Sequence, residues 1–312
     1  MPSTKPDLKK IFVINFVALF SLALLAFLFL TVFSQKKQAY QSVIISPLPS
    51  PLIPTPTPTP KPVNLNNILP PDLSANGIYV VDVTSQTIIY EKNSDLQLFP
   101  ASTTKIMTAL VALDDYKLND VVQIKTLMTE GRIMGLNLNE TITVENLLYG
   151  TLIHSANDAA FALAAYHPGG IEGFVGRMNQ MAQNFGLTKT RFANSVGLDD
   201  PNHFTSSKDL AILSLEALKN PVISKMVAIP QITVSDTTYT YFHPLKNVNE
   251  LLGKIPGVSG LKTGYTDIAG QALVTTVNRK GHEILIVLLK SNDRFGETEK
   301  LISWIFTNFT WQ

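Results

Sequence analysis

The sequence predicts an α/β (α+β) fold, in which an antiparallel sheet is flanked by helices and carries a helical subdomain, behind an N-terminal transmembrane helix. Three observations predict it. An uncharged apolar block lies near the N-terminus, β-rich runs with turn signals lie at both ends of residues 64–312, and helical periodicity lies between them. Strands at both ends favour one antiparallel sheet in which the first and last segments are adjacent.

The composition excludes several classes of protein. The 312 residues include 24 acidic and 25 basic side chains, for a formal charge of +1, and this balance argues against a nucleic-acid partner. Cysteine is absent, which excludes disulfides, thiolate nucleophiles and thiolate metal sites. Charged residues make up 16% of the chain, below the ~25% of a typical soluble domain, so a membrane segment or an uncharged linker is expected.

Residues 11–34 form the apolar block, between lysine pairs at 9–10 and 36–37. About 20 apolar residues cross a ~30 Å hydrocarbon core. A cleavable signal peptide has a shorter apolar core that is followed by a small-x-small site. We therefore expect an uncleaved anchor over 11–34, and the flanking lysines slightly favour a cytoplasmic N-terminus, residues 1–10.

Residues 35–63 are expected to form a Pro/Thr-rich linker, because residues 42–62 contain repeated prolines. Proline fixes φ and removes an amide donor, so this tract cannot join the interior of a helix or sheet. We expect an extended spacer of ~3.1 Å per residue. It would hold the following domain away from the membrane.

Residues 64–312 are expected to form one domain. Runs at 77–83 and 87–91 predict a first hairpin, and runs at 270–278 and 282–290, around the turn 279–281, predict a second. A helix is expected over 171–185, where apolar residues recur at helical spacing, and its methionines are interpreted as core filling. A last helix is expected from about Thr298 to Phe309.

The candidate nucleophiles are hydroxyl groups, because cysteine is absent. The chain has no G-x-S-x-G elbow and no H-E-x-x-H pair, so a histidine triad and a zinc peptidase have little support. The roles of His154 and His203 stay open, and the remaining histidines are expected in loops or on the surface. These are His167, His243 and His282.

The other route uses lysine as the base, since Ser-x-x-Lys places both side chains on one helix face. The pattern occurs three times, at Ser34/Lys37, Ser102/Lys105 and Ser259/Lys262. The first copy lies at the membrane edge and the third is interrupted by glycines. Ser102 instead precedes an apolar helical pattern, where backbone N–H groups and the positive end of the helix dipole would face it. The alternative is an ordinary N-cap serine with a surface lysine.

Two further segments favour the catalytic interpretation. Ser155-Ala156-Asn157 precedes a helix of small residues, and Lys262-Thr263-Gly264 precedes the second hairpin. The order S-x-x-K, S-x-N, K-T-G is the set found in penicillin-binding proteins and class A β-lactamases. The intervals leave room for a helical subdomain.

From about Ser74 to Trp311 the chain resembles the low-molecular-mass penicillin-binding proteins, serine-type D-alanyl-D-alanine carboxypeptidases. The resemblance rests on the blocks FPASTTKIMTALVAL, SANDAAFALA, TRFANSVGLDDPNHFTSSKDLA and LKTGYTDIAGQALV. It implies a β-lactamase/transpeptidase-like fold, with residues 64–312 as the catalytic domain. This domain would lie outside the cytoplasm of a bacterial cell, and residues 11–34 would anchor it to the cell membrane. It implies removal of the terminal D-alanine from peptidoglycan stem pentapeptides, with β-lactam antibiotics as acylating inhibitors. No metal or organic cofactor is implied.

The resemblance also implies a catalytic role for each motif residue. Ser102 would form the acyl-enzyme, with Lys105 as its neutral base. Ser155 would relay a proton to the leaving D-alanine, and Asn157 would hold Lys105 or bind the substrate amide. Burial beside a second cation, Lys262, would lower the pKa of Lys105.

The third motif would bind substrate. Lys262 and Thr263 would engage the terminal carboxylate, and Gly264 would leave room for an extended peptide that adds to the strand. The backbone N–H groups of Ser102 and Tyr265 would form the oxyanion hole.

Three alternatives remain. Many family members carry a β-rich second domain, and the short form found in this sequence raises the expectation of D,D-endopeptidase activity on cross-links. A serine β-lactamase is disfavoured, because the class A glutamate follows the S-x-N motif and the nearest candidate, Glu145, precedes it. An inactive wall-binding or β-lactam-sensing module is the third, and the intact motif residues argue against it.

Overall fold

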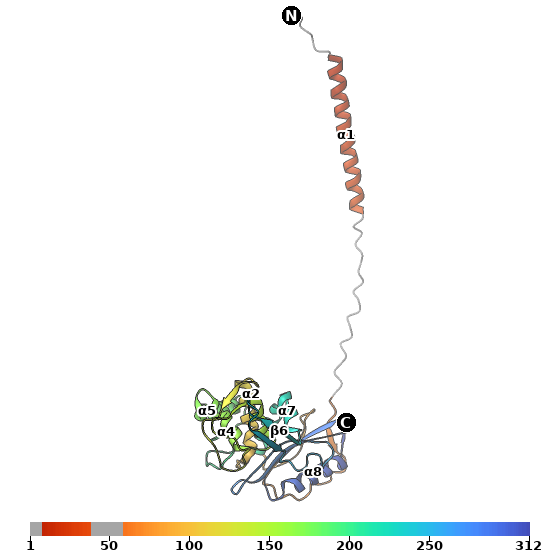
Figure 1. Cartoon of the computed structure of the whole chain (residues 1–312). Coiled ribbons are helices and arrows are strands. Elements are labelled where there is room, and N and C mark those ends of the chain that lie inside the picture. Colours follow the sequence, from red (N-terminus) through yellow and green to blue (C-terminus); the bar gives the residue numbers. More distant parts are fainter. Residues whose placement is uncertain (1–7, 39–58) are drawn as a thin grey trace. The chain divides into compact units, whose positions relative to one another are not determined.

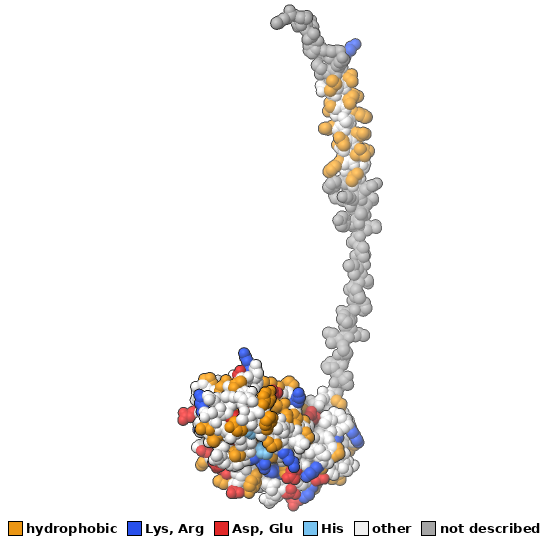
Figure 2. Space-filling model, viewed as in Figure 1, with side chains coloured by type: hydrophobic (Ala, Val, Ile, Leu, Met, Phe, Trp, Pro, Cys, Tyr) orange, Lys and Arg blue, Asp and Glu red, His pale blue; other side chains and the backbone are white. Residues whose placement is uncertain are grey.

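The computed structural model describes residues 8–38 and 59–312, and the chain divides into two units, Met1–Thr57 and Pro58–Gln312 (Figure 1). In the first unit, helix α1 (Leu8–Gln38) includes a 21-residue apolar segment, Phe12–Val32, with a mean hydropathy of 2.7. Hydrophobic side chains cover its visible face (Figure 2). The segment is long and apolar enough to cross a bilayer, which is consistent with the anchor expected there. Most of the predicted linker lies outside the described residues.

The second unit is built on a five-stranded antiparallel sheet with the order β3-β2-β10-β9-β8. The two predicted hairpins are present, and the first lies beside the second, because β2 pairs with β10. The predicted α+β fold with an antiparallel sheet is therefore confirmed. The strands are β2 (Gly77–Asp82), β3 (Ile88–Lys92), β8 (Val258–Thr266), β9 (Gly270–Arg279) and β10 (His282–Ser291).

The sheet is covered on both faces. Strand β10 has six consecutive buried residues whose side chains alternate between two hydrophobic clusters. Leu285 and Val287 face the helical subdomain, while Ile284 and Ile286 face helix α8 (Arg294–Asn308). Helices α2, α4 and α5 lie together on one side of the unit and α8 lies on the other (Figure 1).

Several helices of the helical subdomain begin at residues whose side chains cap the first turn. The side chains of Thr143, Ser206 and Asn220 accept backbone N–H groups at the starts of α3, α6 and α7. The methionine stripe of α5 is buried, as core filling. The helices are α2 (Lys105–Asp115), α3 (Val144–Leu152), α4 (Asn157–Tyr166), α5 (Gly170–Asn184), α6 (Ser207–Leu218) and α7 (Pro221–Val227), with a short 3₁₀ turn, η1 (Ala101–Thr104), before α2.

Three small strand pairs were not predicted: β1 (Pro62–Asn64) with β11 (Phe309–Trp311), β4 (Val121–Gln123) with β5 (Thr141–Thr143), and β6 (Gln231–Ser235) with β7 (Phe242–Lys246). Strand β1 includes the last two residues of the predicted linker. The expected start of the last helix at Thr298 was wrong, because Asp293 caps α8 and accepts the N–H of Gly296.

Candidate active site

Ser102 and Lys105 face each other at the junction of η1 and α2. The Lys105 side chain is fully buried, and its Nζ lies 3.0 Å from the Ser102 Oγ. Ala101, which immediately precedes the serine, has a φ of +48°, a strained value for a residue with a side chain. The alternative of an N-cap serine with a surface lysine is therefore wrong for this pair.

The partners of the Lys105 amine determine where its lone pair points. Besides the Ser102 hydroxyl, Nζ lies 2.6 Å from the Asn157 Oδ1 and 2.6 Å from the carbonyl oxygen of Val196. Both of these oxygens can only accept, and the Asn157 amide is held in this orientation because its Nδ2 donates to the carbonyl of Glu130. A neutral amine has two hydrogens. It donates both to these acceptors and directs its lone pair at the hydroxyl of Ser102.

Burial lowers the pKa of Lys105 to about 7, and the carboxylate of Asp158 acts in the opposite direction. The expected lowering of the Lys105 pKa by Lys262 is not among the causes of its shift. Burial, together with the charges of Lys105, Arg294 and Arg132, lowers the pKa of Lys262 well below its ordinary value. The repulsion between the two buried amines therefore acts on the pKa of Lys262.

The second and third motifs meet through one hydrogen-bonded pair. The Lys262 Nζ donates to the Ser155 Oγ at 2.8 Å and to the carbonyl of Thr263 at 2.9 Å. Ser155 lies in the turn before α4 and has a φ of +60°. The candidate site thus contains two hydroxyl–amine pairs, Ser102 with Lys105 and Ser155 with Lys262.

Gly264 is needed for a reason that the sequence did not indicate. A Cβ at this position would lie 2.9 Å from the Ala101 Cβ and 3.0 Å from the Ser102 nitrogen. A Cβ at Gly197, which has a φ of +90°, would lie only 1.9 Å from the carbonyl oxygen of Ala101. The two glycines let the strained turn that carries Ser102 fit between β8 and the loop at 193–198.

A cleft of about 1170 Å³ opens at this place. β8 is the edge strand of the sheet beside it, so the strand is free to pair with an extended peptide. Lys105 and Lys262 lie buried behind the cleft wall. The other six predicted site residues line it: Ser102, Ser155, Asn157, Thr263, Gly264 and Tyr265.

Residues 64–293 match the sequence model of the peptidase S11 family, D-alanyl-D-alanine carboxypeptidase. The chain belongs to this family. It is 32% identical over 245 residues to the carboxypeptidase DacF of Bacillus subtilis, an alignment that covers 75% of this chain and 63% of the relative. It is 30% identical over 247 residues to the D-alanyl-D-alanine endopeptidase of Escherichia coli. This alignment covers 76% of this chain and 79% of the relative.

Solved structures of the family have the same fold. The Streptomyces K15 DD-transpeptidase matches with a TM-score of 0.72 and 30% identity over 77% of this chain and 100% of its own. Penicillin-binding protein D2 of Listeria monocytogenes, solved in an ampicillin-bound form, matches with a TM-score of 0.67 and 30% identity over 76% of this chain and all of its own. The predicted transpeptidase-like fold and family are confirmed. The chain spans less than two thirds of the length of DacF.

Arg294 is a cleft residue that the sequence analysis missed. Its Nη1 donates to the carbonyl of Gly264 at 2.7 Å, and its Nε is buried without a hydrogen-bond partner among the described residues. Burial lowers the pKa of its guanidinium from the ordinary value. The incorrect start of the last helix placed this residue outside any element, although an arginine in the first turn after an Asp cap was visible in the sequence.

Asp158 was also missed, although it directly follows the S-x-N motif. Its buried carboxylate accepts the backbone N–H groups of Met134, Gly135 and Leu136. It thereby fixes the loop at 124–140 against the first turn of α4. Its signal in the sequence was an acidic residue in the first turn of a predicted helix, where acids are common for helix stability alone.

His203 connects the nucleophile turn to the loop at 193–198. Its Nδ1 accepts the N–H of Ala193 at 2.9 Å, so its Nε2 carries the hydrogen and donates to the Thr104 Oγ1 at 2.7 Å. The ring is therefore neutral, and burial lowers its pKa to about 4. His154 lies on the cleft wall, where its Nδ1 is 3.4 Å from the backbone N of Lys246.

Among residues 8–38 and 59–312, no group of three or more His, Cys, Asp or Glu side chains is arranged to hold a metal ion. Glu145, considered above as a β-lactamase glutamate, lies in the first turn of α3. The carboxylates that line the cleft are instead Glu130, Asp199, Glu250 and Asp267.

Proposed function

We propose that the chain is a serine-type D-alanyl-D-alanine carboxypeptidase, which removes the terminal D-alanine of peptidoglycan stem pentapeptides through an acyl-enzyme on Ser102. The observation that carries the proposal is the hydrogen bonding of Lys105. Two acceptor-only oxygens occupy the hydrogens of its neutral amine and direct the lone pair at the Ser102 hydroxyl. Family membership and the matches to carboxypeptidases of several bacteria support it.

In the acylation step, the Ser102 Oγ attacks the carbonyl between the two D-alanines while its proton passes to Lys105. The C–N bond breaks, and the leaving amine takes a proton from the Ser155 hydroxyl, which regains one from the protonated Lys105, so that Lys105 is neutral again. The backbone N–H groups of Ser102 and Tyr265 would hold the oxyanion, and one such donor contributes ~2.7–4 kcal/mol. Water then cleaves the ester with Lys105 as the base.

The terminal carboxylate of the substrate would bind beside β8. Thr263 offers its hydroxyl, and Arg294 offers a fixed charge next to the carbonyl of Gly264. Arrival of the carboxylate would favour a proton on Lys262, because an opposite charge stabilises the ammonium form. The peptide would lie along β8 as an added strand.

We place the enzyme in the bacterial cell membrane as a single-pass protein, with residues 1–10 in the cytoplasm and the catalytic domain outside. The apolar helix α1 supports the anchor. A catalytic domain that acts on peptidoglycan stem peptides must lie on the side of the cell wall.

Labelling with a fluorescent penicillin, followed by mass analysis of peptide products, tests the proposal. The full chain should be labelled, and Ser102→Ala should not. A purified pentapeptide should lose the mass of one alanine. Labelling that persists in Ser102→Ala would place the nucleophile elsewhere. An unlabelled full chain would favour an inactive wall-binding module, and rapid turnover of the probe would favour a β-lactamase.

Cleavage of D,D-cross-links is the second candidate function. The Escherichia coli endopeptidase is covered over 79% of its length, a larger share than the 63% of DacF. Purified cross-linked muropeptide dimers separate the two activities. Conversion to monomers without loss of alanine from pentapeptides would make the endopeptidase the main activity.

A further inference from the structure

The loop at residues 124–140, between β4 and β5, holds Asn157 in place. Its Arg132 carbonyl accepts the backbone N–H of Asn157 at 2.7 Å, and its Glu130 carbonyl accepts the side-chain Nδ2 at 2.9 Å. The N–H of Met134 donates to the Asp158 carboxylate at 2.9 Å. This loop therefore determines which end of the Asn157 amide faces Lys105.

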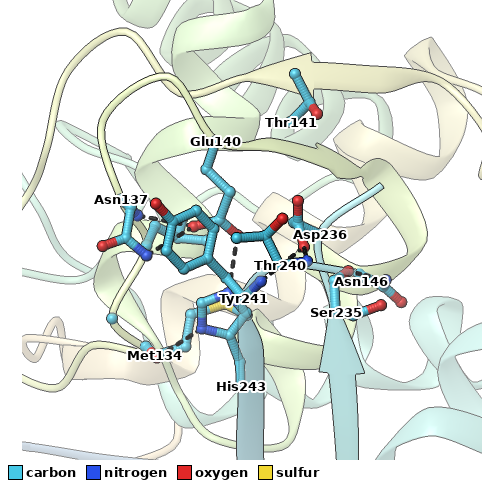
Figure 3. Close-up of polar contacts among 12 residues, drawn as sticks. Met134, Asn137, Glu140, Thr141, Asn146, Ser235, Asp236, Thr240, Tyr241 and His243 are labelled. Atoms are coloured by element: carbon cyan, nitrogen blue, oxygen red, sulfur yellow. Dashed lines mark hydrogen bonds and ion pairs between the residues drawn. The ribbon is translucent and has the colours of Figure 1, made fainter. Parts of the chain in front are cut away.

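A buried polar pair fastens the same loop to strand β7. His243 was expected in a loop or on the surface, but it lies in β7 with its side chain 4% exposed, and the side chain of Glu140 is fully buried. The His243 Nε2 lies 2.8 Å from the Glu140 Oε1, and its Nδ1 lies 3.2 Å from the carbonyl of Met134 (Figure 3). One ring thus holds both the end of the loop and its middle.

The acceptors around the ring fix its hydrogens. The carbonyl of Met134 can only accept, so the Nδ1 of His243 carries a hydrogen. Glu140 also accepts the backbone N–H of Asn137 at 2.8 Å and its Nδ2 at 3.2 Å, both on Oε2. A hydrogen lies between Nε2 and Oε1 whether it belongs to the ring or to the carboxyl group. Both ring nitrogens are therefore engaged by the loop.

Stability alone is a weak reason for such a pair. Hydrophobic residues of similar volume commonly replace buried ion pairs without loss of stability, since desolvation offsets the attraction. Unlike hydrogen bonds, contacts between apolar side chains do not fix the orientation of the groups that they join. His243 bonds the carbonyl of the residue whose N–H bonds Asp158, so two successive hydrogen bonds connect the hairpin to Asp158, the chain neighbour of Asn157.

We propose that Glu140 and His243 are positioning residues for the reaction proposed above: their buried pair keeps the loop at 124–140 in the position that orients the Asn157 amide toward Lys105. When the pair is lost, the folded enzyme binds substrate at Thr263 and Arg294 as before. The lone pair of Lys105 is then no longer directed at Ser102. The proposal rests on the proposed function, because it assigns these residues a part in acylation.

Three variants of the full chain test it. The double variant Glu140→Met/His243→Leu replaces the pair by apolar side chains and leaves no buried charge unpaired. Glu140→Gln is the conservative variant, because its amide can donate to a neutral His243 Nε2 while its oxygen still accepts from Asn137. Asp236→Ala is the matched control. Its carboxylate accepts N–H groups of Thr240 and Tyr241 within the β6–β7 hairpin and does not bond the loop.

The readouts are the rate of acylation by a fluorescent penicillin, kcat and KM for D-alanine release, and the midpoint of thermal unfolding. The double variant should lose about tenfold or more in acylation rate and kcat, since a small misplacement of a reacting group has effects of that size. Its KM should stay within about twofold, because the carboxylate site is intact. Glu140→Gln should keep most of the wild-type rate, and Asp236→Ala should keep it even if its unfolding midpoint falls.

Two results would overturn the proposal. The folded double variant could acylate at the wild-type rate, or Asp236→Ala could lose as much rate as the double variant, which would indicate general destabilisation of the hairpin. Failure of the proposed function is a separate result, since the wild-type chain itself would then be unlabelled and would release no D-alanine.

Discussion

At the scale of single residues, the orientation of the Lys105 amine depends on neighbouring oxygens that can only accept hydrogen bonds. The sequence predicted that Ser102 and Lys105 lie one turn apart, and they do. It could not predict that the carbonyl of Val196 and the oriented amide of Asn157 would take both hydrogens of the amine, because these contacts join segments far apart in the chain. The sequence spacing thus identifies Ser102 and Lys105 as a candidate pair. The tertiary contacts of Lys105 determine where the hydrogens of its amine point.

The rate of acylation should follow the titration of Lys105. Its pKa is about 7, and the neutral form is the base, so the rate should increase about tenfold per pH unit below pH 7 and level off above it. The second-order rate constant with a fluorescent penicillin, measured from pH 5 to 9, checks this. A rate that is independent of pH below 7 would contradict the assigned base.

His203 should make the free energy of unfolding depend on pH in the acidic range. Its folded-state pKa of about 4 lies below the ordinary 6.5, so the unfolded chain binds more protons between these values and stability rises with pH in that window. The contribution lost from pH 6.5 to 4 is about 3 kcal/mol at 1.36 kcal/mol per unit. Urea unfolding of the wild type and of His203→Gln at pH 4.5 and 7 isolates it. An equal pH dependence in both proteins would exclude His203 as the cause.

At the scale of elements, local patterns predicted the two hairpins and the methionine-rich helix, which their own residues specify. The β6–β7 pair was not predicted: residues 231–235 alternate polar and apolar side chains, but residues 242–246 do not, and Pro244 interrupts that strand. The start of α8 was misjudged because the Asp293 cap lies in a polar stretch without apolar periodicity. A helix or strand that is stabilised mainly by packing against other segments is the hardest to predict from its own residues.

The packing of η1 against β8 predicts opposite effects for two glycines. Gly264→Ala would place a methyl group 2.9–3.1 Å from atoms of Pro100, Ala101 and Ser102, so it should cost about 1–3 kcal/mol of unfolding free energy and slow penicillin acylation. Gly176→Ala is the matched control in α5, where the added methyl group would meet no described heavy atom within 4 Å beyond its chain neighbours and its own helix backbone, and it should raise the free energy of unfolding by about 0.5–1 kcal/mol. Denaturant melts and acylation rates of both variants decide this, and normal acylation by Gly264→Ala would contradict the close packing.

At the scale of the whole molecule, the chain combines an apolar helix with a folded unit whose cleft contains the proposed active site. The predicted linker at 35–63 lies largely outside the described residues, so its extended conformation stays a prediction. The anchor was the most direct inference from the sequence, because a 21-residue segment of high hydropathy can be recognised without knowledge of any tertiary contact.

The full chain should remain with membranes after a carbonate wash, while residues 59–312 expressed alone should stay in the supernatant and react with a fluorescent penicillin at the same rate. The reason is that the apolar segment of α1 carries the membrane affinity and the cleft lies wholly within the second unit. Sedimentation followed by gel fluorescence measures both properties. Release of the full chain by carbonate would indicate that α1 does not span the bilayer.

The pairing of β1 with β11 has a consequence for the order of the chain. Pro62 lies opposite Trp311, and the backbone of Lys61 exchanges hydrogen bonds with that of Gln312. The two strands are thus the arms of a hairpin that lacks only its turn. A short Asn-Gly connection from 312 to 61 could supply that turn, so the domain can be circularly permuted and opened at an exposed loop far from the cleft, with every strand pair preserved.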